Sequence, residues 1–124
     1  MLVLYAEDDF EDYTLFLEVL ESIHANVDCI NAVDGTEALK FLEDALVLPD
    51  YIFLDVNMPT MDGKACLIAI KKDPRFKDIP TIVYTTSKNP RDQQFCIELK
   101  AFAYLPKPNS IAEAKEALQK IFVS

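Results

Sequence analysis

Short apolar runs alternate with longer segments of helical periodicity along the whole chain. Five runs rich in β-branched and aromatic residues predict strands, because these side chains suit a pleated, buried surface. They cover residues 2–6, 27–32, 51–54, 81–85 and 102–105. Each run is followed by a segment whose apolar positions recur three or four residues apart, which is typical of an amphipathic helix. The pattern therefore predicts five strand–helix units in succession.

The helical segments carry recognisable start signals. The first follows Asp9, a favourable cap, and its acidic positions, Asp12 among them, are assigned to the solvent face. The fourth opens at Asn89 and Pro90, which suit the cap and the first helical position. The other three are predicted after Asp34–Gly35, after Asp62–Gly63 and from a capping box, Ser110 to Glu113. The apolar stripe of the second helix is assigned to Ala38, Leu39, Leu42 and Leu46.

This alternation predicts the fold class. Strands joined through helices run parallel with right-handed crossovers, and the helices cover both faces of the sheet. The apolar run 51–54 is expected to be a central strand buried on both faces. We therefore expect a doubly wound α/β fold with a five-stranded parallel sheet, and the 124 residues suit one domain, 1–124.

Composition excludes several classes of function. The 21 acidic and 12 basic residues give a net charge of −9, which repels nucleic acid and anionic lipid. The longest apolar stretches reach six residues, far short of the roughly 20 needed to cross a bilayer. The first apolar run ends in Glu7 rather than in a small-residue cleavage site, so we expect a cytoplasmic chain.

The cysteines and the single histidine narrow the chemistry further. Cys29, Cys66 and Cys96 are odd in number and widely spaced, so they suggest core residues rather than disulfides or a zinc cluster. His24 alone cannot supply a two-histidine zinc site and is expected near a helix end.

The ends of the predicted strands carry the residues that suggest chemistry. In open α/β sheets ligands bind outside the carboxyl ends of the strands. Strand 2–6 ends in Glu7-Asp8-Asp9, strand 51–54 in Asp55, strand 81–85 at Thr85, and the last strand leads to Lys107.

Acidic side chains gathered at one sheet edge favour a divalent cation, and hard oxygen ligands suit Mg²⁺. Asp9 has a purely structural alternative as a helix cap, and Thr85 and Lys107 taken singly could be an ordinary strand residue and a surface lysine. Asp55 is the decisive residue, because a carboxylate that ends a buried strand is costly without a cation. With such a cation and Lys107 nearby, one carboxylate could act as a nucleophile toward phosphorus.

These residues resemble the receiver domains of two-component response regulators, including stand-alone receivers of the chemotaxis type. The resemblance extends over essentially the whole chain and rests on four motifs: LVLYAEDD at 2–9, FLDVNMPTMDG at 53–63, IPTIVYT at 79–85 and AYLPKP at 103–108. It implies the flavodoxin-like strand order 2-1-3-4-5.

The resemblance also implies roles for individual residues. Asp55 would be the phosphoacceptor, Thr85 the switch hydroxyl, Lys107 the fixed cation and Tyr104 the rotating aromatic ring. Mg²⁺, or Mn²⁺, would bind to oxygen atoms of Asp8, Asp55 and the Asn57 backbone carbonyl, and Glu7 would act through a bound water.

Some structural details follow from the same resemblance. The Lys107–Pro108 bond is expected to be cis, and Met58–Pro59 and Asp62–Gly63 are assigned structural roles. Thr86 is bulkier than the small residue usual at its position, which predicts slower access to Asp55, and Asn57 and Ser87 match the positions that tune hydrolysis. Lys100 replaces a usual glycine, so the turn there either holds a left-handed lysine or is built differently.

The function expected from this resemblance is a phosphorylation switch. A histidine kinase or phosphotransfer protein would donate a phosphoryl group to Asp55, and the surface of the fourth helix, fifth strand and fifth helix would signal to another protein. The chain would not be an enzyme, although it would assist its own phosphorylation and dephosphorylation. The main alternative is an adaptor that works without phosphorylation.

Two further alternatives are remote. An aspartyl phosphatase of the haloacid dehalogenase type needs a second Asp where Asn57 stands, and a flavodoxin-like electron carrier needs a phosphate-binding first loop that Glu7-Asp8-Asp9 would repel.

Overall fold

The computed structural model describes residues 1–24, 26–58 and 61–123, with the side chain of Val123 excepted. One five-stranded sheet has the order β2-β1-β3-β4-β5, and all its pairings are parallel. The strands are β1 (Leu2–Ala6), β2 (Asp28–Ala32), β3 (Tyr51–Leu54), β4 (Thr81–Thr85) and β5 (Ala103–Pro106). The strand order and the parallel sheet are confirmed.

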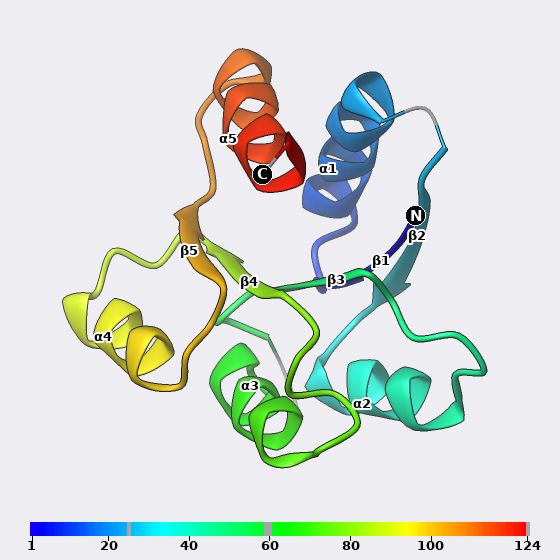
Figure 1. Ribbon diagram of the computed structural model, residues 1–124. Coiled ribbons are helices and arrows are strands. Elements are labelled where there is room, and N and C mark those ends of the chain that lie inside the picture. Colours follow the sequence, from blue (N-terminus) through cyan, green and yellow to red (C-terminus); the bar gives the residue numbers. More distant parts are fainter. Residues whose placement is uncertain (25, 59–60, 124) are drawn as a thin grey trace.

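Five helices alternate with the strands and enclose the sheet. They are α1 (Phe10–Ile23), α2 (Gly35–Asp44), α3 (Gly63–Lys72), α4 (Pro90–Glu98) and α5 (Ile111–Val123). Helices α1 and α5 cover one face of the sheet, and α2, α3 and α4 cover the other (Figure 1). Both faces of the sheet are therefore covered by helices, as is usual for a parallel sheet.

The two halves of the core differ in composition. The half under α1 and α5 is aromatic, and Tyr5 lies at its centre, with ring centroids 4.4 Å from Phe16 and 6.2 Å from Phe53. The half under α2, α3 and α4 is largely aliphatic and includes the buried Cys66 and Cys96. All three cysteines are free, and two of them are core residues as predicted, whereas Cys29 is half-buried.

The caps explain where the helices begin. Asp9 accepts hydrogen bonds from the backbone N–H groups of Glu11 and Asp12, which confirms its structural role. Ser110 accepts from the N–H of Glu113 at 3.1 Å, whereas the Glu113 carboxylate accepts from the N–H of Asn109 at 3.4 Å. The capping box is therefore formed in part: Ser110 caps the helix as predicted, but Glu113 binds the N–H of Asn109 instead of the N–H of Ser110.

The predicted stripe of the second helix is wrong at its last position. Helix α2 ends at Asp44, Ala45 has extended backbone angles, and Leu46 lies in the following loop, fully exposed. Pro49 prevents the helix from continuing into β3, because a proline disfavours helical geometry in the residue before it, but α2 already ends at Asp44.

Two further details concern the backbone. Lys100 has φ 63°, so the left-handed alternative for this turn is confirmed. The expected cis bond is wrong: the Lys107–Pro108 peptide is trans, the form that is intrinsically favoured even before proline. The turn predicted at Met58–Pro59 falls partly outside the described residues, since Pro59 is not among them. Within the described parts, no helix is long and apolar enough to span a bilayer.

Candidate functional site

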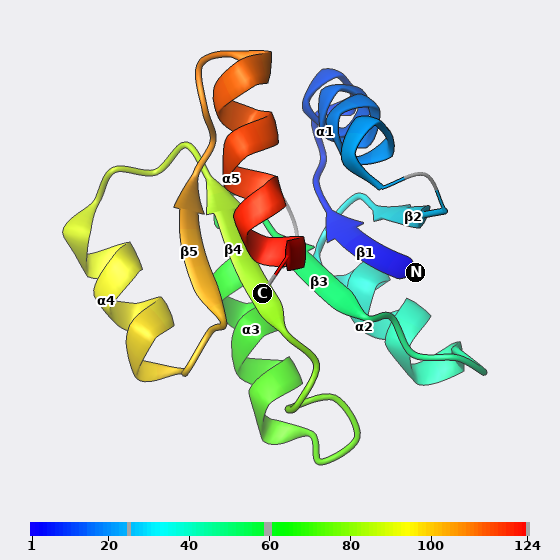
Figure 2. The same cartoon turned by 45° about the horizontal axis from the view of Figure 1, so that its top comes forward.

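The carboxyl ends of the strands bring the predicted acidic residues and the lysine together. In Figure 2, β4 and β5 run upward, toward the loops that lead to α4 and α5. Strands β1 and β3 are parallel to them, so the residues that follow β1 and β3 leave the sheet at the same edge. Glu7 follows β1 and Asp55 follows β3, and both are buried, at 1% and 5% exposure. Lys107 reaches them from the end of β5.

The Lys107 ammonium is the centre of this cluster. It donates hydrogen bonds to Asp55 Oδ2 at 2.8 Å, to Asp12 Oδ2 at 2.9 Å and to Glu7 Oε1. Burial disfavours its charge, but the hydrogen bonds to Asp55, Glu7 and Asp12 outweigh burial and raise the pKa of Lys107 above its ordinary value. Lys107 is therefore a permanent cation among the carboxylates.

The two buried carboxyl groups are electrostatically different. Burial, together with the neighbouring Asp55, raises the pKa of Glu7 to about 9. Burial also acts to raise the pKa of Asp55, but hydrogen bonds with Glu7 and Lys107, and the Lys107 charge, lower it overall. The Lys107 ammonium therefore favours the ionised form of Asp55, which is the form that a nucleophile requires.

The donor set fits a divalent cation. Glu7 Oε2 is buried and has no hydrogen-bond partner among the described residues, and Asp8 and Asn57 are exposed at the rim. Asp55 Oδ1 accepts only the Asn57 N–H, at 3.2 Å, in the described structure. No three acidic, histidine or cysteine side chains of the described ranges are gathered around one point as a ready cluster. The oxygen chemistry is nonetheless that of hard cations.

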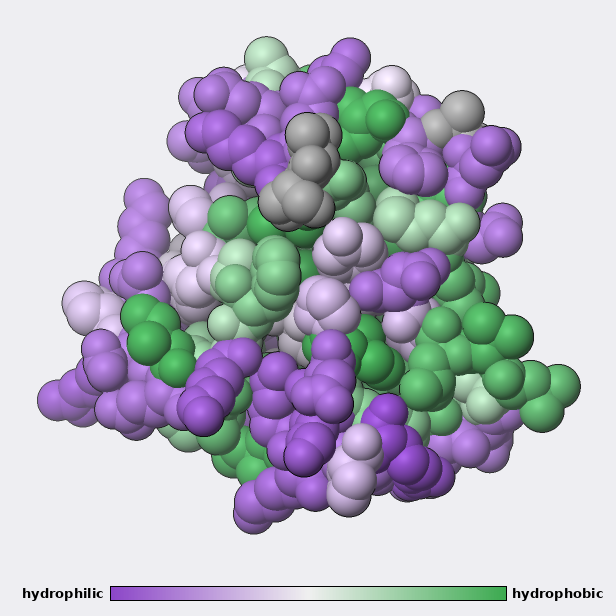
Figure 3. Space-filling view, viewed as in Figure 1, coloured by the Kyte–Doolittle hydropathy of each residue, from purple (hydrophilic) through white to green (hydrophobic). Residues whose placement is uncertain are grey.

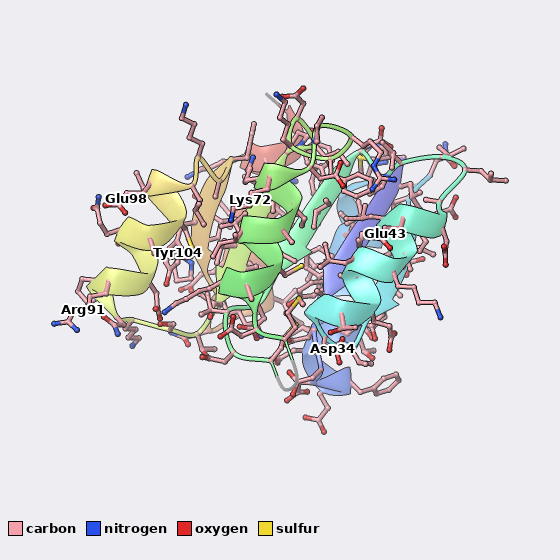
Figure 4. The ribbon with its side chains drawn as sticks, turned by 90° about the horizontal axis from the view of Figure 1, so that it is seen from below. Asp34, Glu43, Lys72, Arg91, Glu98 and Tyr104 are labelled. Atoms are coloured by element: carbon pink, nitrogen blue, oxygen red, sulfur yellow. The ribbon has the colours of Figure 1, made fainter. Side chains whose placement is uncertain are left out.

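Thr85 and Tyr104 are connected through Ser87. Thr85 is fully buried, and its hydroxyl oxygen accepts the Ser87 N–H at 3.1 Å. The Tyr104 hydroxyl donates to the Ser87 carbonyl at 3.1 Å. Figure 4 shows Tyr104 beside α4, on the face that α2, α3 and α4 cover. The loop after β4 therefore ties the predicted switch hydroxyl to the predicted switch ring.

Sequence reasoning missed three contributors to this region. Asp12 was assigned to the solvent face, yet its carboxylate binds Lys107. Asp92 on α4 accepts a hydrogen bond from the Ser87 hydroxyl and forms an ion pair with Lys64 on α3. The Lys64 ammonium and then the Ser87 hydroxyl lower the pKa of Asp92. The sequence held a weak indication of these two roles: Asp12 and Asp92 each lie three residues after a helix cap, in the first turn of a helix that begins near the strand ends.

Gly63 brings α3 close to the phosphoacceptor candidate. A Cβ atom at this position would lie 2.1 Å from the Asp55 carbonyl oxygen, far inside van der Waals contact. The Gly63 N–H also donates to the Val56 carbonyl at 3.1 Å. The absence of a side chain at Gly63 therefore fixes the backbone on which Asp55 is carried.

Comparison with known proteins decides the family. A family model, the response regulator receiver domain, matches residues 3–119. The chain belongs to this family. Receiver domains are phospho-accepting signalling domains of two-component systems, and they take the phosphoryl group from histidine kinases or phosphotransfer proteins.

Relatives of this receiver domain include proteins of similar and of much greater length. It is 34% identical to response regulator Rcp1 of Synechocystis sp., over 97% of this chain and 85% of that protein. It is also 28% identical to the sensor histidine kinase CheAY of Helicobacter pylori, over 88% of this chain but only 13% of the kinase. The same kind of domain thus occurs in proteins of very different size.

Solved structures agree with the fold and bear on the site. The Mn²⁺-bound form of Rcp1 superposes with a TM-score of 0.86 at 34% identity, covering 97% of this chain and 90% of that one. The phosphorylated cyanobacterial phytochrome response regulator RcpA superposes with a TM-score of 0.90 at 28% identity, covering 99% and 94%. Binding of a divalent metal is therefore a property of this kind of receiver domain.

Proposed function

We propose that Asp55 is the residue that accepts the phosphoryl group, from a histidine kinase or a phosphotransfer protein, in a switch that works through Mg²⁺. The observation that supports this most strongly is geometric: Asp55 ends a central strand, is buried, and accepts a hydrogen bond from the Lys107 ammonium at 2.8 Å, a contact that favours its ionised form. An ionised, fixed oxygen is the reactant that attack on phosphorus requires.

The transfer exchanges one bond for another. An Asp55 carboxylate oxygen forms the new P–O bond while the P–N bond to the donor histidine breaks, and the electron pair of that bond stays on the histidine nitrogen. Lys107 lies 2.8 Å from Asp55 Oδ2, so its ammonium is placed to neutralise charge on the incoming group. Glu7, Asp8, Asp55 and the Asn57 carbonyl would hold Mg²⁺, or Mn²⁺, which supplies further charge neutralisation when bound.

The response to phosphorylation passes through the Ser87 connection. The Thr85 hydroxyl turns toward the phosphoryl oxygens and gives up the Ser87 N–H, and the loop movement releases the Tyr104 hydroxyl from the Ser87 carbonyl. Tyr104 then follows into the vacated space, so the surface of α4, β5 and α5 changes and another protein reads it.

The chain has the role of a signalling domain rather than of an enzyme, and it assists its own phosphorylation and dephosphorylation through the same residues. We place this exchange in the cytoplasm, where free thiols such as Cys66 and Cys96 persist.

Intact-mass spectrometry after incubation with acetyl phosphate, with and without Mg²⁺, tests the assignment. The wild-type chain and an Asp78→Ala control, which removes an exposed carboxylate from the opposite end of the sheet, should each gain one phosphoryl group only with Mg²⁺. Asp55→Ala should gain none. A phosphoryl group on Asp55→Ala would place the acceptor elsewhere. No gain in the wild type, even with an active histidine kinase, would favour the adaptor.

A further inference from the structure

An exposed apolar loop lies between α2 and β3, at the amino ends of the strands. Leu46 is fully exposed and Val47 is 72% exposed, and Leu48 beside them is also exposed. Figure 3 looks onto this end of the molecule, and the hydrophobic colour gathers over the connection from α2 to β3. Nothing in the phosphorylation site uses these side chains, which lie at the opposite end of the sheet.

The same end of the molecule carries a groove of complementary character. The groove has a volume of about 620 Å³ and lies between the α3–β4 and α4–β5 connections. Its apolar walls are formed by Ile79, Pro80, Leu99 and Phe102, and its charged residues are Lys71, Lys77, Lys100 and Asp78. Phe102 is 52% exposed here, so the groove presents aromatic surface to solvent.

Charge is distributed between the loop and the groove in opposite senses. The exposed Glu43 and Asp44 immediately precede the loop, whereas lysines outnumber acidic residues at the groove three to one in a chain of net charge −9. The Lys71 ammonium donates to the Lys77 carbonyl, and among the described residues neither Lys77 nor Lys100 has a carboxylate partner. The groove therefore fits an apolar segment flanked by acidic residues.

We propose that a second copy of this chain supplies that segment, so that residues 45–48 of each copy occupy the groove of the other. The loop and the groove lie on one face, so a two-fold axis through this face forms both contacts at once and closes the assembly as a dimer. A single chain already contains both the acidic, apolar segment and the basic, apolar groove. The dimer leaves the carboxyl end of the sheet open to a phosphoryl donor.

Sedimentation velocity of the full chain over a concentration series tests this dimer. The wild-type chain should dimerise without acetyl phosphate, and dimerisation should weaken at higher salt because the exposed charge pairs are screened. Leu46→Asp should raise the dissociation constant by at least about tenfold. Ile111→Asp, which changes another exposed aliphatic residue at the start of α5, is the matched control and should leave the constant unchanged.

A charge exchange identifies the contacting surfaces. Lys77→Glu with Lys100→Glu, or Glu43→Lys with Asp44→Lys, should each weaken the homodimer, because both of its contacts become repulsive. An equimolar mixture of the two double variants should recover dimers, because every loop then meets a groove of opposite charge. Circular dichroism of each variant confirms that it is folded.

Three results would overturn the proposal. A wild-type chain that stays monomeric over the whole series, a Leu46→Asp variant that dimerises like the wild type, or a mixture of charge variants that recovers nothing would each do so. The phosphorylation assay is independent of these outcomes, since it concerns the other end of the sheet.

Discussion

The two ends of the sheet differ in which side chains are buried and which are exposed. At the carboxyl end, charged side chains are buried and joined to one another, with Lys107 bonded to three carboxylates. At the amino end, the apolar Leu46 is fully exposed and Lys77 and Lys100 have no carboxylate partner in the described structure. The difference teaches that stability should depend strongly on polar residues at one end and weakly on apolar residues at the other.

The largest effect is expected from Lys107→Met in the absence of metal. Removing the ammonium leaves the buried acidic side chains of Glu7 and Asp55 without their cation, so the free energy of unfolding should fall by about 3 kcal/mol. Urea denaturation measures the loss, and saturating Mg²⁺ should reduce it. Lys120→Met, which breaks an exposed ion pair with Glu116, is the control and should change the free energy by less than about 0.5 kcal/mol. Equal losses in the two variants would remove the contrast between buried and exposed charge.

Gly63→Ala should lower the free energy of unfolding by about 2 kcal/mol. The new Cβ would meet the Asp55 carbonyl oxygen, a backbone atom that cannot move without displacing the site, so overpacking outweighs the gain in helix propensity. Phosphorylation by acetyl phosphate should slow in the same variant. In Gly35→Ala the closest contacts are longer, 2.8 Å to Met61 Cγ and 2.9 Å to the Met61 carbonyl oxygen, so a smaller loss is expected. Thermal denaturation of both variants compares them, and the reverse ranking would contradict this explanation.

Asp92→Asn should lower the free energy of unfolding by about 1 kcal/mol at neutral pH. The change removes the ion pair with Lys64 and weakens the hydrogen bond from the Ser87 hydroxyl. Because Lys64 lowers the pKa of Asp92 in the folded state, this stabilisation is present above the unfolded pKa of about 4 and is lost as pH falls through the folded value. Denaturation at neutral and acidic pH should show the two proteins converging in acid, and a constant difference would exclude the charge as the cause.

The smallest effect is expected from Leu46→Ser. A fully exposed leucine loses no burial on truncation, so in dilute solution the free energy of unfolding should change by less than about 0.5 kcal/mol. Leu67→Ala, at a fully buried position on α3, should cost about 3 kcal/mol under the same conditions. A large loss in Leu46→Ser would mean that the amino end supports the fold as well.

The fold and the centre of the site could be predicted because they depend on periodicity and topology. Apolar runs of strand length alternating with helical patterns define a parallel sheet, and a parallel sheet places Glu7, Asp55 and Lys107 at one edge. This juxtaposition needs no knowledge of side-chain conformations. The assignment of individual metal ligands to Asp8 and Asn57 stays a prediction.

The features that could not be predicted depend on which neighbour a side chain finds. Periodicity places Asp12 on a polar face, but it does not reveal that a lysine 95 residues away reaches it. The pairing of Asp92 with Lys64 depends on how closely the neighbouring helices α3 and α4 approach each other, which the sequence pattern does not give. Leu46 was misassigned because its spacing continues the helical stripe, whereas the helix ends at Asp44, before it reaches Leu46.

The hydrogen bond from Lys107 to Glu7 joins residues that are 100 positions apart in the chain, so the site depends on both ends of the domain. A domain generally folds as a unit, and the acidic partners Glu7, Asp12 and Asp55 all precede the lysine that binds them. A chain that ended before β5 would therefore lack the cation of the site. Competence to receive a phosphoryl group belongs to the whole sheet and to no part of it.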